Sequence, residues 1–230
     1  MLHNERQRLI IRIRSLLSNC TEGVSNVAVG RPIDEAKTAI ILGAARDIFF
    51  AQGFAHASIE AIAAQAGVSK VTIYNRFGTK EALFSNMVAQ ECDRMRSGLQ
   101  QVTQMGDNIA ETLTYFALNM TEFLAHDDIT RIEAHLAVEA EHNPDLGKLF
   151  LDAGPRRLQK FLAMILADAH ESGQLNIDDA DEAAELFAGM VKGFADMDRR
   201  FRQNGPDAKR KAEKRISSAV RLFIKGYGVS

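Results

Sequence analysis

Apolar positions recur every three or four residues along most of this chain of 230 residues. No stretch alternates apolar and polar residues with enough β-branched side chains to predict a sheet. The helical periodicity, together with only four prolines, therefore predicts an all-α protein made of amphipathic helices. The predicted helices span residues 33–53, 58–66, 69–75, 81–104, 107–125, 129–141, 144–172 with a bend near 154, 180–201 and 206–227.

The stretch SIEAIAAQAGVSKVTIYNRFGTKEALF, residues 58–84, predicts two short helices joined by a tight turn and followed at once by a third. Ser58 is placed to cap the first helix, and Ser69 is placed to cap the second. Gly67 supplies the left-handed backbone that ends the first helix. Two helices joined in this way are typical of the helix-turn-helix, whose second helix enters the major groove of DNA. We interpret residues 69–75 as that recognition helix.

Several side chains around this unit could contact DNA. Within the recognition helix, Val71 is expected to lean toward the protein, with Phe77 following as an anchor, while Lys70 is the leading candidate for reading base edges. Arg31 would lie in the minor groove or in a solvated linker, and Thr38 would meet a phosphate or simply be exposed. The candidate DNA-binding residues are Arg31, Thr38, Ser58, Ser69, Lys70, Thr72, Tyr74, Asn75 and Lys80.

The same stretch carries a family resemblance. IAAQAGVSKVTIYNRFGTKEALF resembles the signature of the TetR family of transcriptional regulators, and the match continues upstream through ILGAARDIFFAQGFAHAS. Segments of the second half, such as EAEHNPDLGKLF, are similar to a C-terminal domain common in that family. The resemblance covers residues 33–227. It implies a DNA-binding domain at residues 33–80 and a helical ligand-binding and dimerisation domain at residues 81–230.

Residues 1–32 exceed what the resemblance covers. Their first part, MLHNERQRLIIRIRSLLSNC, predicts a basic amphipathic helix, and the next ten residues have the composition of a loop. Three interpretations stay open for this segment. It is an arm that touches DNA or packs on the body, a disordered extension, or a stretch encoded upstream of the true start.

The net charge of −2 hides a gradient along the chain. Residues 1–33 carry five basic and two acidic side chains, residues 34–80 carry five and four, and residues 81–230 carry eighteen and twenty-four. Attraction to DNA must therefore be local to the N-terminal third. Cys20 and Cys92 give no sign of a disulfide framework, which fits a cytoplasmic protein. No apolar run reaches the roughly 18 residues of a membrane span.

The last two predicted helices have apolar faces that are wider than one small domain needs. Gly189 and Gly193 would let another helix approach one of these faces closely. The resemblance implies that the two helices pair with their copies in a four-helix bundle; alternatively, they only close the core of their own chain. The candidate interface residues are Phe187, Val191, Phe194, Ile216, Val220, Phe223, Ile224 and Tyr227.

Methionine and phenylalanine side chains from several predicted helices could converge on an internal cavity, since both adapt well to apolar ligands. Taken one at a time, each of these residues is explained by core packing more often than by contact with a ligand. The candidate pocket residues are Met87, Phe116, Met120, Phe123, Leu136, Glu139, Phe161, Met164, Phe187 and Met190.

One set of polar residues has the spacing of a metal site. His135, Glu139 and His142 fall at helical spacing. Relative to the apolar face of that helix, however, the three side chains point in different directions, and we expect no metal. Glu139 would instead cap a helix or pair with an arginine such as Arg156 or Arg157. No phosphate-binding loop or activated nucleophile is present in the sequence, so we expect neither a cofactor nor an enzyme.

These observations predict a homodimeric TetR-type repressor that binds a palindromic DNA operator and is released by a small molecule. A second hypothesis keeps the fold but has no inducer, and makes the chain a ligand-independent DNA-binding or protein-interaction factor. A third hypothesis, a helical metal-dependent enzyme, would require bound metal.

Overall fold

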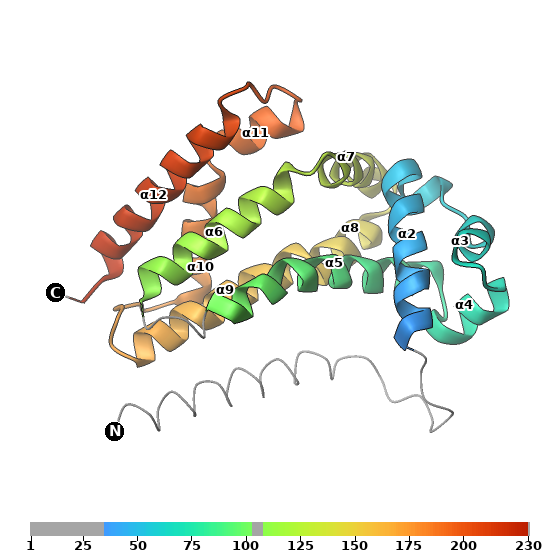
Figure 1. Ribbon diagram of the computed structural model, residues 1–230, viewed down its shortest axis with the longest axis horizontal. Coiled ribbons are helices and arrows are strands. Elements are labelled where there is room, and N and C mark those ends of the chain that lie inside the picture. The colour runs from blue at the N-terminus through green and yellow to red at the C-terminus, as the bar shows by residue number, and fades with distance from the viewer. Residues whose placement is uncertain (1–34, 103–107, 230) are drawn as a thin grey trace. The chain divides into compact units, whose positions relative to one another are not determined.

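The computed structural model describes residues 35–102 and 108–229, without the side chains of residues 97–102 (Figure 1). All regular elements of this described part are helices, which confirms the all-α class. Arg31, Cys20 and the extension at residues 1–32 lie outside it. The helices are α2 (Glu35–His56), α3 (Ile59–Ala66), α4 (Lys70–Phe77), α5 (Lys80–Val102), α6 (Ile109–Ala125), α7 (Asp127–His142), α8 (Pro144–Ala153), α9 (Pro155–Glu171), α10 (Ala180–Lys192), α11 (Ala195–Arg200) and α12 (Ala208–Tyr227).

A first hydrophobic cluster joins α2, α3 and α4 to the first half of α5 and to α7 and α8. Three aromatic rings lie in it: Phe84 packs edge-on against Phe49 at 5.1 Å and against Phe54 at 5.3 Å between ring centroids. Such aromatic pairs stabilise a core beyond the area that they bury. The core beneath the helix-turn-helix therefore extends past residue 80, while the division into domains at that residue stays a prediction.

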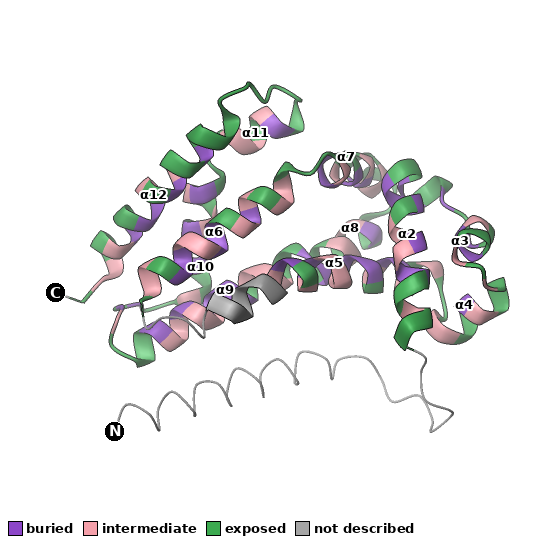
Figure 2. Ribbon diagram, viewed as in Figure 1, coloured by how far each residue is buried: buried purple, intermediate pink, exposed green. Residues whose placement is uncertain are grey.

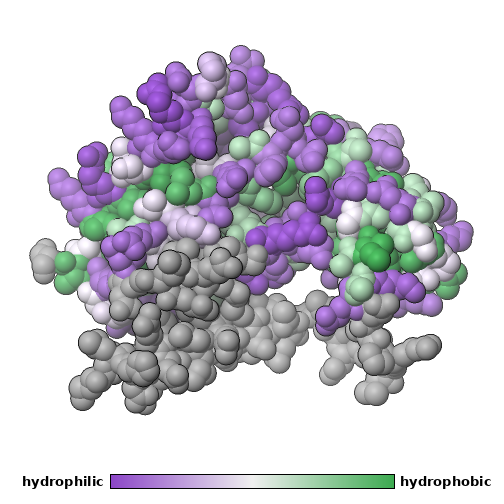
Figure 3. Space-filling model, viewed as in Figure 1, coloured by the Kyte–Doolittle hydropathy of each residue, from purple (hydrophilic) through white to green (hydrophobic). Residues whose placement is uncertain are grey.

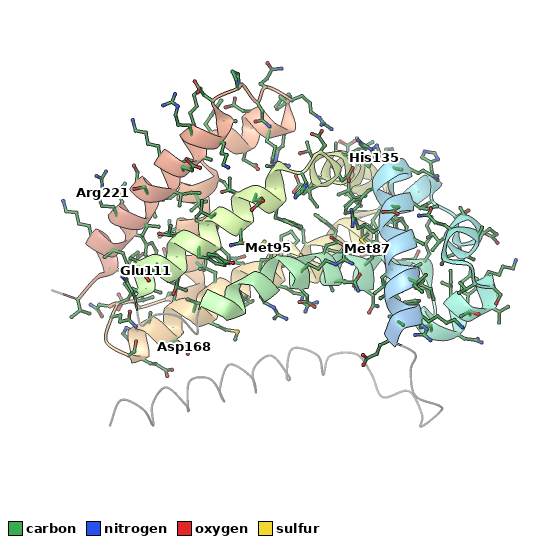
Figure 4. All side chains as sticks on the ribbon, viewed as in Figure 1. Met87, Met95, Glu111, His135, Asp168 and Arg221 are labelled. Carbon is green, nitrogen blue, oxygen red and sulfur yellow. The ribbon has the colours of Figure 1, made fainter. Side chains whose placement is uncertain are left out.

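A second hydrophobic cluster is built from the second half of α5 and from α6, α9, α10 and α12. Phe187 of α10 packs edge-on against Phe223 of α12, with 5.2 Å between the ring centroids. Helix α5 contributes to both clusters, since Met87 belongs to the first and Met95 to the second (Figure 4). One continuous helix therefore links the two cores, as the sequence predicted.

Two predicted helices are broken where glycine occurs. The predicted helix 180–201 ends at Lys192 because Gly193 has φ 52° and ψ −157°, a conformation that only glycine adopts readily. Gly193 therefore makes a turn between α10 and α11. A Cβ there would lie 2.9 Å from Cδ of Arg215 on α12, so a helix of the same chain comes close to this glycine, while the approach of a helix from a second copy stays a prediction. The predicted bend near residue 154 is a complete break, with Pro155 starting α9.

The helix α2 is long and apolar enough by composition to cross a membrane, but half of the relevant window is buried inside the protein. Ile41 and Phe49 are completely buried there, as expected for a core helix. The adjacent Ile40 is also apolar, but 56 % of its surface is exposed. The helical repeat explains the difference: burial is centred on Ile41 and Ala45, so Ile40 points about 100° away.

The end of α2 is held between α5 and α7. Gly53 has φ 79° and redirects the chain, so that the backbone N–H of Ala55 donates to Oε2 of Glu139 at 3.0 Å. From the other side, Nζ of Lys80 lies 3.4 Å from the carbonyl oxygen of Ala55 and 4.5 Å from the ring centroid of Phe54. We call Gly53, Phe54, Ala55, Lys80 and Glu139 the α2 junction.

The partners of Glu139 differ from those that the sequence suggested. Arg156 pairs with Asp152 at 2.6 Å, and Arg157 lies 3.4 Å from Asp93, so neither arginine pairs with Glu139. Glu139 accepts instead from the backbone N–H of Ala55, which is 84 residues away in the sequence. The contact between α7 and α2 could not be read from local spacing.

Replacing Gly53 with alanine tests the α2 junction. A Cβ at this position would lie 2.8 Å from Oε1 of Glu139 and 3.1 Å from Nδ1 of His135. Together with the positive φ, this clash should lower the free energy of unfolding by about 2 kcal/mol. Denaturant titration followed by circular dichroism measures the change.

Gly43→Ala is the matched control, because Gly43 lies within α2 and a Cβ there meets nothing within 4 Å. That change should raise the free energy of unfolding by about 0.5 kcal/mol, since alanine favours a helix more than glycine does. Equal effects of the two substitutions would contradict the α2 junction.

Candidate nucleic-acid interface

Three local features build α3 and the turn that follows it: a side-chain cap, a left-handed glycine and a backbone hydrogen bond. The side chain of Ser58 accepts the N–H of Ala61 at 3.1 Å and caps α3. Gly67 lies in the left-handed region at φ 65°, and the N–H of Val68 donates to the carbonyl of Ala63 at 3.0 Å. This closure of the α3 C-terminus fixes where the next helix starts.

Helix α4 begins where the sequence predicted and ends two residues later. Oγ of Ser69 accepts the N–H of Thr72 at 3.1 Å and lies 3.0 Å from its hydroxyl. The helix continues to Phe77, and the N–H of Gly78 donates to the carbonyl of Tyr74 at 2.8 Å. Ser69 and Thr72 are thus already hydrogen-bonded to each other at the N-terminus of the candidate recognition helix.

Only one side chain of α4 is fully buried. Ile73, at 1 % exposure, anchors the helix, whereas Val71 is 58 % exposed. Figure 2 shows most of α4 in the colours of exposed and intermediate residues. The prediction that Val71 leans toward the protein was wrong: α4 packs through the position two residues later, about 200° around the helix. An exposed aliphatic group on a recognition helix is suited to contact the methyl group of thymine.

The outward face of α4 also carries polar groups. Lys70 and Asn75 are exposed, and Tyr74 is 46 % exposed. Nζ of Lys70 lies 3.4 Å from Oε1 of Glu60, with both side chains more than half exposed. Such surface ion pairs contribute little free energy, so this contact leaves Lys70 available to a stronger partner.

The structure adds a basic residue that the sequence analysis missed. Nη1 of Arg76, in the last turn of α4, donates to Oγ1 of Thr38 near the start of α2. The arginine is partly buried and ties the two helices together beside the exposed face of α4. The signal that could have identified Arg76 is its basic side chain in the last turn of the recognition helix.

Lys80 is oriented differently from what the sequence suggested. Its ammonium group points toward Ala55. Burial lowers the pKa of this group, although the negative charges of Glu81 and Glu139 act to raise it. Its position at the start of α5 is as expected. The contact of Lys80 with DNA stays a prediction, while within the protein its ammonium group lies 3.4 Å from the carbonyl oxygen of Ala55.

The candidate pocket residues are divided between the two hydrophobic clusters, and their contact with a ligand stays a prediction. Met87 and Leu136 lie in the first cluster, while Phe116, Phe161 and Phe187 lie in the second. Phe123 packs against both clusters, Met190 packs against the second, Met164 is partly buried and Glu139 is in the α2 junction. A cavity of about 780 Å³ lies instead between α6, α10, α11 and α12, and of the ten candidates only Met120 lines it.

Most candidate interface residues are buried within their own chain. Phe187, Val191, Ile216, Val220 and Phe223 are at most 7 % exposed. Ile224 and Tyr227 are partly buried, and Phe194 is 78 % exposed. Other large apolar side chains of α10, α11, α12 and the loop after α11 are also exposed, namely Leu186, Met197, Phe201 and Leu222.

Two family models match this chain. Residues 41–87 match the one described as bacterial regulatory proteins of the tetR family, and residues 111–229 match the one described as the AefR-like transcriptional repressor C-terminal domain. The second alone spans more than half of the chain. The chain belongs to the TetR family.

Relatives and solved structures agree with this assignment. The TetR-family chain is 26 % identical over 138 residues to the HTH-type transcriptional regulator UidR of Escherichia coli K12, covering 60 % of this chain and 68 % of UidR. It is similar to the flavonoid-responsive regulator FrrA, at 30 % identity with a TM-score of 0.64, covering 84 % of this chain and 98 % of that one. A TetR-family regulator from Mesorhizobium loti shares the fold, at 24 % identity with a TM-score of 0.72, covering 86 % and 100 %.

The TetR assignment confirms a DNA-binding transcriptional regulator and not an enzyme. It also explains why α4 exposes polar groups around a single buried anchor, Ile73. The residues that contact DNA within this interface stay predictions, since the comparisons are between proteins and contain no DNA.

Substitution of Ser69 by alanine tests how α4 is capped. The change removes the acceptor for the N–H of Thr72, so the free energy of unfolding should fall by about 1 kcal/mol. Ser217→Ala is the control, because Ser217 is exposed within α12 and caps no helix. Chemical denaturation of both variants measures the difference, and an equally small effect in both would contradict the cap.

Proposed function

We propose that this TetR-family protein is a cytoplasmic repressor that binds a palindromic DNA operator as a homodimer and is released by a small molecule. The observation that carries the proposal is the outward face of α4, where Lys70, Val71, Tyr74 and Asn75 are exposed around the buried anchor Ile73. This arrangement leaves side chains of several chemistries free to read the major groove.

Dimerisation is supported by the apolar surface of α10 to α12. Leu186, Phe194 and Leu222 are each about half exposed or more, although their helices also have fully buried apolar sides. Exposed apolar groups gathered on neighbouring elements are characteristic of protein interfaces. A two-fold axis through this surface would place two copies of α4 for half-sites about 34 Å apart, which a monomer cannot do.

Release by a small molecule is supported by similarity and by the cavity. FrrA, which is named as flavonoid-responsive, shares 30 % of its residues with this chain over 98 % of its own length. The cavity of about 780 Å³ is within the size range of small-molecule sites. A ligand that favours one conformation of the dimer would change the spacing of the recognition helices and so the affinity for DNA.

The base-reading role of Lys70 can be tested by selecting binding sites from random duplexes. The wild-type chain should enrich a palindrome whose half-sites are about one helical turn apart. Lys70→Ala should weaken binding to the selected site by about 10-fold to 100-fold and relax the preference at one position of each half-site.

Lys214→Ala makes the same change of charge on α12, on an exposed side chain. It should leave the preferred sequence unchanged. Identical preferences for the wild type and Lys70→Ala would contradict the proposed reading of bases by Lys70.

Dimerisation through α10 to α12 predicts that Leu222→Asp weakens self-association by at least about 10-fold, because a buried unpaired charge is costly. Val138→Asp is the control, since Val138 is 62 % exposed on α7. Sedimentation equilibrium measures both dissociation constants. A dimer that tolerates Leu222→Asp as well as Val138→Asp would place the interface elsewhere.

A further inference from the structure

The outward face of α4 has a definite centre. Ile73 is the buried anchor of this helix, and successive residues of a helix lie about 100° apart around its axis. The direction opposite Ile73 therefore falls between Val71 and Asn75, about 20° from each. Both of these residues are exposed. Val71 and Asn75 are thus the residues of α4 that point most directly away from the protein.

Other side chains of α4 lie toward the flanks of this face. Thr72 and Tyr74 are each about 80° from its centre, and Lys70 is about 120° from it. Lys70 already lies beside Glu60, and the hydroxyl of Thr72 lies 3.0 Å from Oγ of Ser69. Because the major groove is about 8.5 Å deep, short side chains reach base edges only from the centre of the face, whereas lysine and tyrosine can reach DNA from a flank.

The chemistry of valine restricts what Val71 can recognise. Its side chain has neither a donor nor an acceptor, so it cannot hydrogen-bond to a phosphate or to the polar atoms of a base. Among the groups that base pairs display in the major groove, the 5-methyl group of thymine is the apolar one. Val71 is 58 % exposed, and packing it on that methyl group would remove apolar surface of both from water. Figure 3 shows that the surface at α2, α3 and α4, on the right of the view, is hydrophobic in part.

Asn75 offers the groups that adenine requires. An asparagine amide has a donor beside an acceptor, and the two match the N6 amino group and the N7 acceptor of adenine in the major groove. The side chain of Asn75 makes no hydrogen bond to any other residue that the structure describes. Its amide is therefore available to a base without first breaking a contact within the protein.

The spacing of the two residues limits the distance between the bases that they can contact. Four residues of a helix span about 6 Å along its axis, and neighbouring base pairs are about 3.4 Å apart. Val71 and Asn75 therefore reach bases that lie within about two base pairs of each other.

We propose that Val71 and Asn75 are specificity-determining residues for the operator. Val71 packs on the 5-methyl group of a thymine in each half-site, and Asn75 pairs with an adenine within about two base pairs of that thymine. The proposal rests on the proposed function for the docking of α4 in the major groove. It adds to that function the chemistry of two bases in each half-site.

Uracil tests the contact of Val71, because it lacks only the 5-methyl group of thymine and pairs with adenine in the same way. In the duplex that the full wild-type chain selects, thymine is replaced by uracil at one equivalent position of both half-sites at a time. At one such position the replacement should raise the dissociation constant about 10-fold, since a methyl contact is lost in each half-site. Fluorescence anisotropy of the labelled duplexes measures the change.

Val71→Ala should bind the thymine and uracil duplexes equally, because the partner of the methyl group is removed. Val138→Ala is the matched control, since Val138 is 62 % exposed on α7, and this variant should prefer thymine as the wild type does. A wild-type chain that is indifferent to uracil at every thymine would overturn the assignment of Val71. A Val71→Ala variant that keeps the full preference would overturn it too.

7-Deazaadenine tests Asn75, because it lacks only the N7 acceptor of adenine. At one adenine of each half-site, within about two base pairs of the uracil-sensitive thymine, this replacement should weaken wild-type binding by at least about 10-fold. It should not change binding by Asn75→Ala. Asn204→Ala, at an exposed position between α11 and α12, is the control and should stay sensitive. A wild-type chain without such an adenine, or equal sensitivity in Asn75→Ala, would overturn the assignment of Asn75.

Failure of this assignment can be distinguished from failure of the proposed function. A wild-type chain that selects no duplex would refute the proposed function and the assignment together. A wild-type chain that selects a palindrome but senses neither the thymine methyl group nor N7 of adenine would refute the assignment alone.

Discussion

The hydrogen bond from Ala55 to Glu139, together with the packing of Phe84 on Phe49 and Phe54, joins the DNA-binding helices to the body of the protein. It joins the C-terminal end of α2 to α7, while Lys80 holds the same segment from α5. The segment can pass between these helices only because Gly53 adopts a positive φ and has no Cβ. The DNA-binding unit is thus fixed to the body of the protein by backbone groups of a few residues, in addition to the shared aromatic core.

The two hydrophobic cores therefore support different parts of the protein. The first cluster includes the helix-turn-helix together with α7 and α8, so a shift of α7 would move residues that support α2. The second cluster is formed by the helices that carry the proposed dimer surface. Because packed cores change between discrete arrangements, α5 and α7, which extend between these regions, are the elements through which the two can influence each other.

Local chemistry made much of this fold predictable. Ser58, Gly67 and Ser69 act within a few residues of their own positions, and the sequence alone located these caps and the turn between them. The phase of α4 was not predictable in the same way: Val71 and Ile73 are both apolar, and only the packing against the neighbouring helices decides which is buried. The partner of Glu139 is 84 residues away, so spacing along the chain contained no signal for it.

The cavity, like the partner of Glu139, depends on residues that are far apart in the sequence. Composition directed attention to methionine and phenylalanine, yet these residues pack against each other and fill the two cores. The cavity forms where Gly193 interrupts the predicted helix and starts α11 in a new direction. That turn lets Arg199 reach Thr130 and Glu133 on α7, which a helix continuing straight from α10 would not direct it to. The break at Gly193 thus adjoins both the cavity and the segment whose buried Arg199 contacts α7.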